Sequence, residues 1–314
     1  MNCYKTYLLI LFLITRAVVF SQEIDTINNR IAAEKMYNQA LDFQSNGMID
    51  NAIKAFNNSI ALDSTYDGCY LGRGSLYLDL GDIDLAQYDF ERTILLNPSN
   101  FKAYYKLGEI YFILEEYELA IHQFLHAIEY NSDYVFAYND LGSAYRMIGD
   151  FPHAIMYYSL AIELNSTYAY IFNNRGSCLR EMGKYESAIE DYSKAIDLNP
   201  YYALAYNNRG SAYFRLENYF DALLDFDSAI EADWTFTFAY NNRGYAKYKL
   251  NLYEEAIKDY NKAIKLDEEY GIAYFNRGVS KQMLLDNEST CADWMKALEL
   301  GIHSASTYIK TSCE

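Results

Sequence analysis

Apolar and small residues recur along this chain with a fixed period of 34 residues. The stretches AYNNRGSAYFRLENYFDALLDFDSAIEAD (205–233) and AYNNRGYAKYKLNLYEEAIKDYNKAIKLD (239–267) show the repeat directly. Within a repeat, the apolar positions fall three and four residues apart, which is the spacing of an amphipathic helix. Self-similarity at this period is typical of helical hairpins that stack on one another, so we expect an array of two-helix units.

Small residues occupy two positions in nearly every unit. The units begin at residues 33, 67, 101, 135, 169, 203, 237 and 271, and we number the places in each from 1 to 34. Small residues at places 8 and 20 let two antiparallel helices approach closely, and aromatic residues at places 4 and 24 fill the space beside that contact. Place 8 holds Ala40, Gly74, Gly108, Gly142, Gly176, Gly210, Gly244 and Gly278, and place 20 holds Ala52, Ala86, Ala120, Ala154, Ala188, Ala222, Ala256 and Thr290.

With these residues the array resembles the tetratricopeptide repeat family from residue 33 to residue 304. The family's alanine at place 27 is also present, in Ala127, Ala161, Ala195, Ala229, Ala263 and Ala297. Its proline at place 32 remains only in Pro98 and Pro200, so the boundaries between repeats are less sharply marked. The resemblance implies an all-α fold, an α-solenoid in which antiparallel helix hairpins form a right-handed superhelix. We expect a helical leader at 22–32, eight repeats at 33–66, 67–100, 101–134, 135–168, 169–202, 203–236, 237–270 and 271–304, and a capping helix at 305–314.

The first 21 residues have the pattern of a secretory signal peptide. An apolar run extends from Leu8 to Ile14, and Val19 and Ser21 lie three and one residues before a cut at Gln22. The apolar segment falls short of the roughly 20 residues that span a bilayer. We therefore expect a protein exported to the periplasm, the cell envelope or the outside of the cell, with no membrane span after cleavage. The alternative is an uncleaved N-terminal anchor.

Charge narrows the range of partners. The chain has 26 Lys and Arg against 43 Asp and Glu, a formal net charge of −17, and it contains no run of basic residues. Such a surface repels nucleic acid and anionic lipids. We expect no nucleic-acid partner.

Arginine and aspartate occur together at two places of the repeat. Five repeats have Arg at place 7, and the same five, with no others, have Asp at place 23. The two repeats with leucine at place 7, Leu107 and Leu141, have other residues at place 23. A half-buried guanidinium needs a carboxylate for its donors, so we expect an ion pair inside each hairpin; the alternative is a row of ligand-binding arginines. The expected pairs are Arg73 with Asp89, Arg175 with Asp191, Arg209 with Asp225, Arg243 with Asp259 and Arg277 with Asp293.

One side of each first helix is expected to line a groove for a ligand. Places 4, 7, 8 and 11 form the buried stripe, and places 2, 5, 6, 9, 12 and 13 share the opposite side. Asparagine recurs at places 5 and 6, where its carboxamide could hydrogen-bond the main chain of an extended peptide. At place 6 this row is similar to the asparagine ladder of O-linked N-acetylglucosamine transferases; the alternative is a consensus residue tolerated at a wet face. The residues concerned are Asn139, Asp140, Asn173, Asn174, Asn207, Asn208, Asn241, Asn242 and Asn276.

Aromatic and basic side chains accompany this row in the later repeats. They include Phe214, Tyr248, Arg146, Arg180 and Arg215. Aromatic residues and arginine are the usual anchors of protein interfaces, so we expect a protein or peptide ligand, with acidic ligands among the candidates. The alternative is that the aromatic residues only pack neighbouring repeats together.

The five cysteines fall into different settings. Cys69 and Cys178 occupy places where small side chains pack, so we expect them to be buried and inert. A turn at Ile302 would place Cys291 and Cys313 level across an antiparallel pair of helices, because both lie eleven residues from it. In an oxidising compartment these two could form a disulfide that fixes the terminal cap.

The sequence contains none of the common catalytic motifs, such as a Gly-rich phosphate loop, HExxH or a paired CxxC. His122 and His126 lie one helical turn apart, but at outward places, so we expect a solvated face and no metal site. We therefore expect a non-enzymatic binding scaffold without cofactors. Two alternatives are a structural assembly subunit that uses its outer helices or ends, and an accessory to glycan or cell-wall enzymes.

Overall fold

The computed structural model describes residues 2–313, with side chains described at residues 16, 20 and 22–313 except 287. Within this range all regular secondary structure is α-helical, which confirms the predicted fold class. The helices are α1 (Asn2–Ser45), α2 (Ile49–Leu62), α3 (Asp67–Leu80), α4 (Ile83–Leu96), α5 (Phe101–Ile113), α6 (Tyr117–Tyr130), α7 (Val135–Met147), α8 (Phe151–Leu164), α9 (Ala169–Glu181), α10 (Tyr185–Leu198), α11 (Ala203–Arg215), α12 (Tyr219–Ala232), α13 (Thr237–Lys249), α14 (Tyr253–Leu266), α15 (Gly271–Met283), α16 (Asn287–Glu299) and α17 (Ala305–Ser312).

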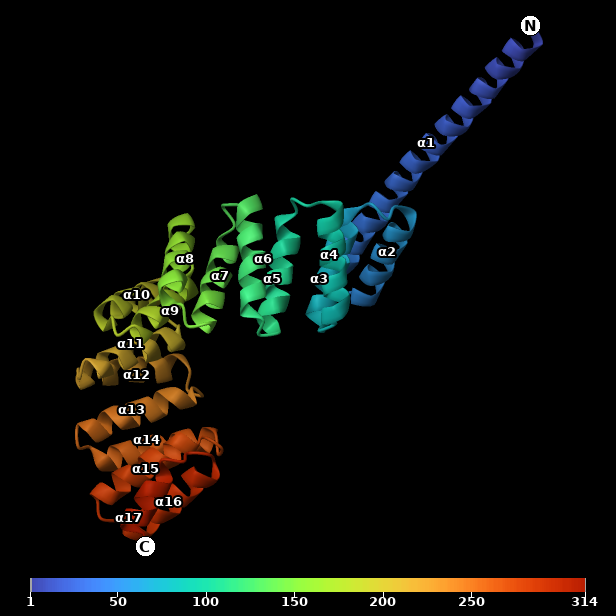
Figure 1. Ribbon diagram of the computed structural model, residues 1–314. Coiled ribbons are helices and arrows are strands. Elements are labelled where there is room, and N and C mark those ends of the chain that lie inside the picture. Colours follow the sequence, from blue (N-terminus) through green and yellow to red (C-terminus); the bar gives the residue numbers. More distant parts are fainter. Residues whose placement is uncertain (1, 314) are drawn as a thin grey trace. The chain divides into compact units, whose positions relative to one another are not determined.

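Within each of two compact units, consecutive helices pack as hairpins, such as α3 with α4 and α11 with α12, and consecutive hairpins pack on each other, such as α2 with α3 and α12 with α13 (Figure 1). The first helices of neighbouring hairpins also touch, α1 with α3, α3 with α5, α9 with α11, α11 with α13 and α13 with α15. The contacts group the chain into two compact units, one up to residue 144 and one from residue 145. Each unit is a stack of hairpins in which a repeat buries its apolar faces against its neighbours, as in an α-solenoid.

The turn inside each hairpin has one residue with a left-handed backbone, always at place 15. Glycine occupies this place in four repeats, for example Gly183 with φ of +74°. The other four repeats place a larger residue in the same conformation: Glu115, Glu217, Asn251 and Leu285 have φ of +61° to +62°. Residues other than glycine are strained there, because Cβ approaches the backbone. Four hairpins are therefore closed at some cost in stability.

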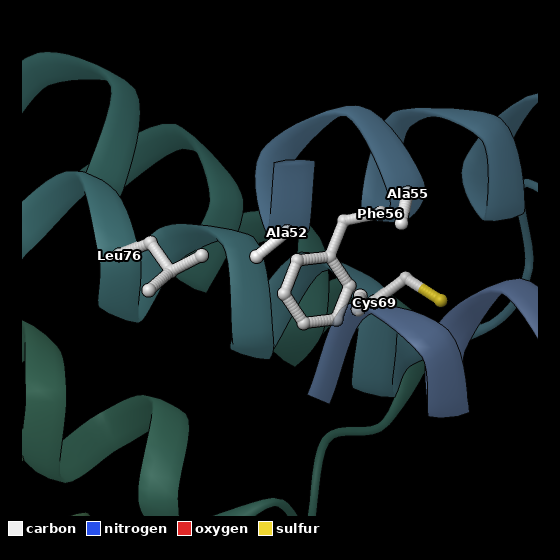
Figure 2. Packing of buried hydrophobic residues seen from close by; sticks show 6 residues of the cluster. Ala52, Ala55, Phe56, Cys69 and Leu76 are labelled. Carbon is white, nitrogen blue, oxygen red and sulfur yellow. The ribbon is translucent and has the colours of Figure 1, made fainter. Parts of the chain in front are cut away.

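The two helices of a hairpin approach closely where a glycine at place 8 faces the aromatic residue at place 24. A Cβ built on Gly210 would lie 2.9 Å from the ring of Phe226, so only glycine fits without a shift of the aromatic ring. The Phe56 ring on α2 lies in a cluster with Ala52 and with Cys69 and Leu76 of α3, and all four residues are at most 1% exposed (Figure 2). The close approach of two helices explains why these places are small.

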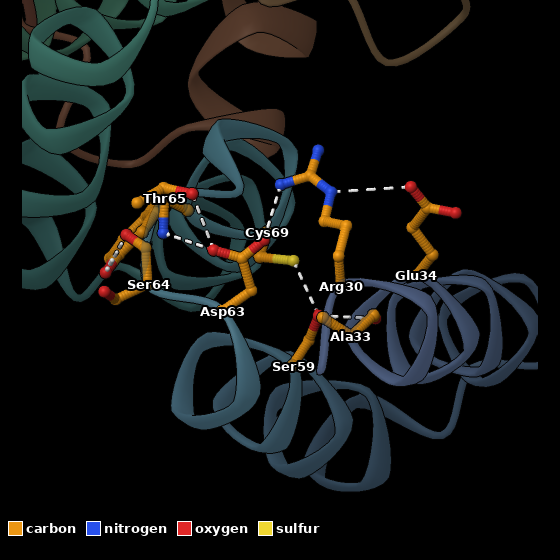
Figure 3. Close-up of polar contacts among 9 residues, drawn as sticks. Arg30, Ala33, Glu34, Ser59, Asp63, Ser64, Thr65 and Cys69 are labelled. Atoms are coloured by element: carbon orange, nitrogen blue, oxygen red, sulfur yellow. Dashed lines mark hydrogen bonds and ion pairs between the residues drawn. The ribbon is translucent and has the colours of Figure 1, made fainter. Parts of the chain in front are cut away.

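Helix α1 runs from Asn2 to Ser45 without a break at residue 21 or 32, so the expected leader and the first helix of the array are one helix. Arg30 joins the leader to the first hairpin (Figure 3). Its Nη1 donates to Oδ2 of Asp63 at 2.7 Å, and its guanidinium lies 4.1 Å from the centre of the Tyr66 ring. Nearby, Ser59 donates from Oγ to the carbonyl of Ala33 at 2.6 Å.

The expected signal peptide falls largely on residues whose side chains lie outside the described range, including Val19 and Ser21. Its cleavage therefore stays a prediction. Among the side chains that are described, no helix combines the length and the apolar composition that crossing a membrane requires.

Helix α17 covers the last hairpin. Cys291 on α16 and Cys313 at the end of α17 form a disulfide, with an S–S distance of 2.02 Å. The Tyr308 ring lies 5.1 Å from the rings of both Phe275 and Trp294. The last repeat is thus joined to α17 by an apolar contact and a covalent link.

Candidate functional site

The arginines at place 7 and the aspartates at place 23 form the ion pairs that their joint occurrence predicts. In the sixth repeat, Nε and Nη2 of Arg209 donate to Oδ2 and Oδ1 of Asp225 at 2.9 and 2.7 Å. All five aspartates are at most 5% exposed, so each pair is largely shielded from water. The same two-bond geometry joins Arg73 to Asp89, Arg175 to Asp191, Arg243 to Asp259 and Arg277 to Asp293.

The third nitrogen of each guanidinium reaches the preceding repeat. Nη1 of Arg209 donates to Oγ of Ser193 at 2.9 Å, at place 25 of the repeat before it. Arg175 donates in the same way to Ser159, at 3.0 Å. Asn57, Asp227 and Asn261 accept the equivalent bond from the other three arginines. A single arginine therefore closes its own hairpin and links it to the previous one through all three nitrogens of its guanidinium.

Burial and ion pairing shift the pKa values of several of these arginines and aspartates. The hydrogen bond with Asp191 raises the pKa of Arg175, so this guanidinium stays charged. Burial raises the pKa of Asp89 and of Asp225, against the opposing influence of their arginines. The carboxylates are thus held charged in the interior by their partners, and loss of an arginine would leave a buried carboxylate unpaired.

The asparagines at places 5 and 6 correct the expectation that both rows face a ligand. Asn207 and Asn241 are 7% and 5% exposed. Nδ2 of Asn242 donates to Oδ1 of Asn207 at 2.9 Å, and Asn276 donates likewise to Asn241 at 3.0 Å. The place-5 asparagines, Asn139, Asn173, Asn207 and Asn241, are all at most 7% exposed because they lie where two repeats meet.

Asn208, at place 6, is also buried, with 9% of its surface exposed, and donates to Asn173 at 2.9 Å. Tyr105 and Asp140 occupy the same two places and make the same link with other chemistry, since the Tyr105 hydroxyl donates to Oδ2 of Asp140 at 2.6 Å. Burial raises the pKa of the Asp140 carboxyl. The sequence contained a signal for these links between repeats, because polar residues recur in pairs that lie 35 positions apart.

A pocket of about 390 Å³ opens on the first helices of three successive hairpins, α9, α11 and α13. Most of its lining comes from places 6, 9, 12 and 13, which the sequence assigns to the exposed side of the first helix. Phe226 lies at its base on α12, at only 1% exposure. The lining residues are Arg180, Glu181, Tyr185, Ser211, Phe214, Arg215, Phe226, Asn242 and Tyr245.

Two of the lining rings, Phe214 and Tyr245, are in contact, and Tyr248 stacks beside them. The Phe214 and Tyr245 rings lie 4.9 Å apart, and Tyr248 stacks on Tyr245 with ring centres 6.1 Å apart. Tyr245 is 37% exposed, so its ring is accessible to a ligand. A surface of adjoining, partly exposed rings can bind apolar or aromatic side chains.

Arg180 and Arg215 give the pocket positive charge. The Arg215 guanidinium lies over the Tyr185 ring at 5.5 Å. Nη2 of Arg180 donates to Oε1 of Glu181 at 2.9 Å, while Nε of Arg180 is buried without a hydrogen-bond partner. Two guanidinium groups face one carboxylate, so the pocket is locally basic in a chain of net charge −17.

The remaining candidates lie apart from this pocket. Arg146 near the end of α7 and Asn174 on α9 are half-buried and do not line it. The unit up to residue 144 has a comparable, smaller pocket of about 230 Å³ on α1, α3 and α5. Its polar lining includes Lys102 and Lys106, and its aromatic lining includes Tyr37.

Among the described residues, no group of three His, Cys, Asp or Glu side chains is arranged to hold a metal ion. The rings of His122 and His126 lie 4.6 Å apart, and Nδ1 of His126 lies 3.1 Å from Glu129. Cys69 and Cys178 are free and fully buried, and burial raises the pKa of each thiol to about 11. These two thiols are therefore protonated at neutral pH and unsuited to nucleophilic chemistry.

The stacked hairpins and the pocket on their first helices define the class of the protein, a helical repeat solenoid. Family models described as TPR repeat and tetratricopeptide repeat match residues 176–217, 71–134, 137–168 and 237–270. The chain belongs to the tetratricopeptide repeat proteins, a family that generally serves as a scaffold for protein interactions.

Solved structures agree in fold. YrrB, described as a TPR protein with an unusual peptide-binding site, is 24% identical, with a TM-score of 0.53 over 60% of this chain and 96% of its own. A TPR repeat-containing protein from Cytophaga hutchinsonii is 22% identical, with a TM-score of 0.62 over 76% of this chain and 98% of its own. MamA is 29% identical, with a TM-score of 0.50 over 54% of this chain and 92% of its own. No curated protein matches the chain.

Proposed function

We propose that this protein is a non-enzymatic scaffold that holds a protein or peptide segment against the first-helix side of its repeats. The observation that carries the proposal is the pocket on α9, α11 and α13, because it brings two arginines and the partly exposed ring of Tyr245 together on the first-helix side of the repeats. Arg209 and Asn207, by contrast, make their hydrogen bonds within the stack. Because the polar residues of the stack satisfy one another, exposed pocket side chains such as Arg215 and Tyr245 are left for recognition.

We further propose that the scaffold acts in the cell envelope or outside the cell. Two features support this: the N-terminal pattern of a signal peptide and the disulfide between Cys291 and Cys313. Structural disulfides persist in oxidising compartments and are rare in the cytosol. The fractionation of the native protein, followed by N-terminal sequencing, tests this; recovery in the cytosol with residues 1–21 retained would contradict it.

A pull-down with matched surface variants tests the binding function. We expect Tyr245→Ser combined with Tyr248→Ser to lose the specific partners captured by the wild type from an envelope fraction. The control changes Phe220 and Leu224 to serine, since these α12 residues are 73% and 65% exposed and lie outside the pocket. Loss of partners only in the control would favour the assembly subunit that uses outer helices, and unchanged capture by both variants would contradict the pocket.

A further inference from the structure

Two of the four histidines of the chain lie next to each other on α6. His122 and His126 are four residues apart, so their side chains project from one face of the helix, one turn apart. Their ring centres are 4.6 Å apart, and the rings are nearly perpendicular. They occupy places 22 and 26 of the third repeat, and no other repeat has a histidine at either place. The pair is therefore not part of the pattern that builds the stack.

Neighbouring side chains hold the His126 ring in one orientation. Its Nδ1 lies 3.1 Å from Oε2 of Glu129, and this nitrogen donates, because a carboxylate can only accept. The Tyr104 ring packs against the imidazole, with 5.2 Å between the ring centres. In the neutral imidazole the lone pair is then on Nε2, where a metal ion can bind. A carboxylate on one ring nitrogen and a metal on the other is the usual arrangement of a metal-binding histidine.

The number of ligands indicates which metal fits. His122 is exposed, so its ring can turn to bring a nitrogen toward the same ion. Two imidazoles one helical turn apart can bind a single ion, as in the HExxH helix of zinc enzymes. A structural zinc site needs four protein ligands, whereas no third His, Cys, Asp or Glu completes a site in the part of the chain that the structure describes. Cu²⁺ binds nitrogen ligands more tightly than Zn²⁺ or Ni²⁺ and accepts a tetragonal geometry.

We propose that His122 and His126 bind one Cu²⁺ ion, that Glu129 orients the His126 ring, and that water fills the remaining coordination positions. This replaces the expectation that the two histidines only face solvent. The site uses no residue of the pocket on α9, α11 and α13, so the inference is independent of the proposed function. Because the protein supplies two ligands only, the ion is exchangeable and can also accept a donor atom from another molecule.

Titration of the full chain with Cu²⁺ tests the site. Calorimetry, with glycine as a weak competing chelator, measures the affinity, and electron paramagnetic resonance counts the nitrogen ligands. We expect one Cu²⁺ coupled to two imidazole nitrogens, and Zn²⁺ to bind more weakly. His122→Gln and His126→Gln should each weaken the binding of Cu²⁺ by about tenfold or more, and Glu129→Gln by about threefold, since Glu129 is exposed and only orients a ligand.

His153 provides the matched control. Its Nδ1 lies 2.7 Å from Oδ2 of Asp150, and its ring stacks on Tyr145 with 5.1 Å between the centres. It therefore has a carboxylate and a tyrosine ring as His126 does, but no second imidazole one turn away. His153→Gln should leave the binding of Cu²⁺ unchanged. Circular dichroism confirms that each variant is folded.

The contrary results are distinct. Equal binding of Cu²⁺ by the wild type and by His122→Gln/His126→Gln would overturn the site. A loss in His153→Gln as large as that in His126→Gln, or coupling to a single nitrogen, would show that one imidazole beside a carboxylate is sufficient, and the two-histidine site would be wrong. Tighter binding of Zn²⁺ than of Cu²⁺ would overturn the choice of metal.

Discussion

Nδ2 of Asn242 donates a hydrogen bond to Oδ1 of Asn207, 2.9 Å away and one repeat earlier. Asn207 is 7% exposed, so this bond lies in the seam between two hairpins and is shielded from water. Its effect is to fix the register of one repeat on the next. Residues that resemble a ligand-binding ladder in the sequence therefore contribute to the stability of the stack.

Asn207→Ala should lower the free energy of unfolding by about 1 to 2 kcal/mol, because the half-buried Asn242 carboxamide loses its acceptor in the seam between two repeats. Chemical denaturation of the full chain measures this. Asn58→Ala, at an exposed position on α2, serves as the control and should change stability by less than about 0.5 kcal/mol. Equal effects of the two substitutions would show that the link contributes nothing.

Asp225→Ala should destabilise the chain by about 3 kcal/mol, because it leaves the guanidinium of Arg209 half-buried without its carboxylate. The third repeat suggests a compensating pair of residues, because it has Leu107 and Gln123 at the same two places. The double variant Arg209→Leu/Asp225→Gln should regain most of the lost stability, as read from thermal melting. A double variant as unstable as Asp225→Ala would mean that the ion pair is not the cause.

Glu217→Gly should raise stability by up to about 1 kcal/mol, because glycine relieves the strain of a positive φ in the turn between α11 and α12. The reverse change, Gly183→Glu, places glutamate in the equivalent turn and should lower stability by a similar amount. Denaturant midpoints of both variants test the pair. A loss of stability in Glu217→Gly would indicate that the greater freedom of glycine in the unfolded chain outweighs the strain.

The thiols of Cys69 and Cys178 should react slowly with iodoacetamide in the folded protein near pH 8, since burial raises the pKa of each to about 11. Reactivity should increase as the pH rises toward that value. Because each folded pKa lies above the ordinary thiol value of 9.0, the two thiols favour the folded state below about pH 9 and lose this contribution between about pH 9 and 11. Rapid alkylation of both thiols at neutral pH in the native state would contradict the burial.

Iodoacetamide labelling followed by mass spectrometry also counts the cysteines that are not in a disulfide. Denatured without reductant, a cleaved chain should take up label at Cys69 and Cys178 only, and reduction should release Cys291 and Cys313. Retention of residues 1–21 would add Cys3 as a third labelled site before reduction. Four labelled sites in the unreduced, cleaved chain would show that the disulfide is absent.

The sequence by itself determined the relations that lie within one repeat. Because the repeat occurs eight times, the presence of arginine at place 7 and aspartate at place 23 in the same five copies identified the ion pair of Arg209 with Asp225. The small residues at places 8 and 20 predicted the hairpin for the same reason. Equal distances from a turn placed Cys291 opposite Cys313, since an antiparallel pair fixes which residues are level.

Only the tertiary structure decided what happens between repeats. The helical period assigned Asn207 to an exposed side of α11, but the next hairpin covers it and supplies Asn242 as its donor. The third bond of Arg209, to Ser193, depends on the same stacking. The pocket forms because α9, α11 and α13 bring Arg180, Arg215 and Tyr245 together. Periodicity describes one helix at a time, whereas burial and pairing across a seam depend on the distance and angle at which two hairpins pack.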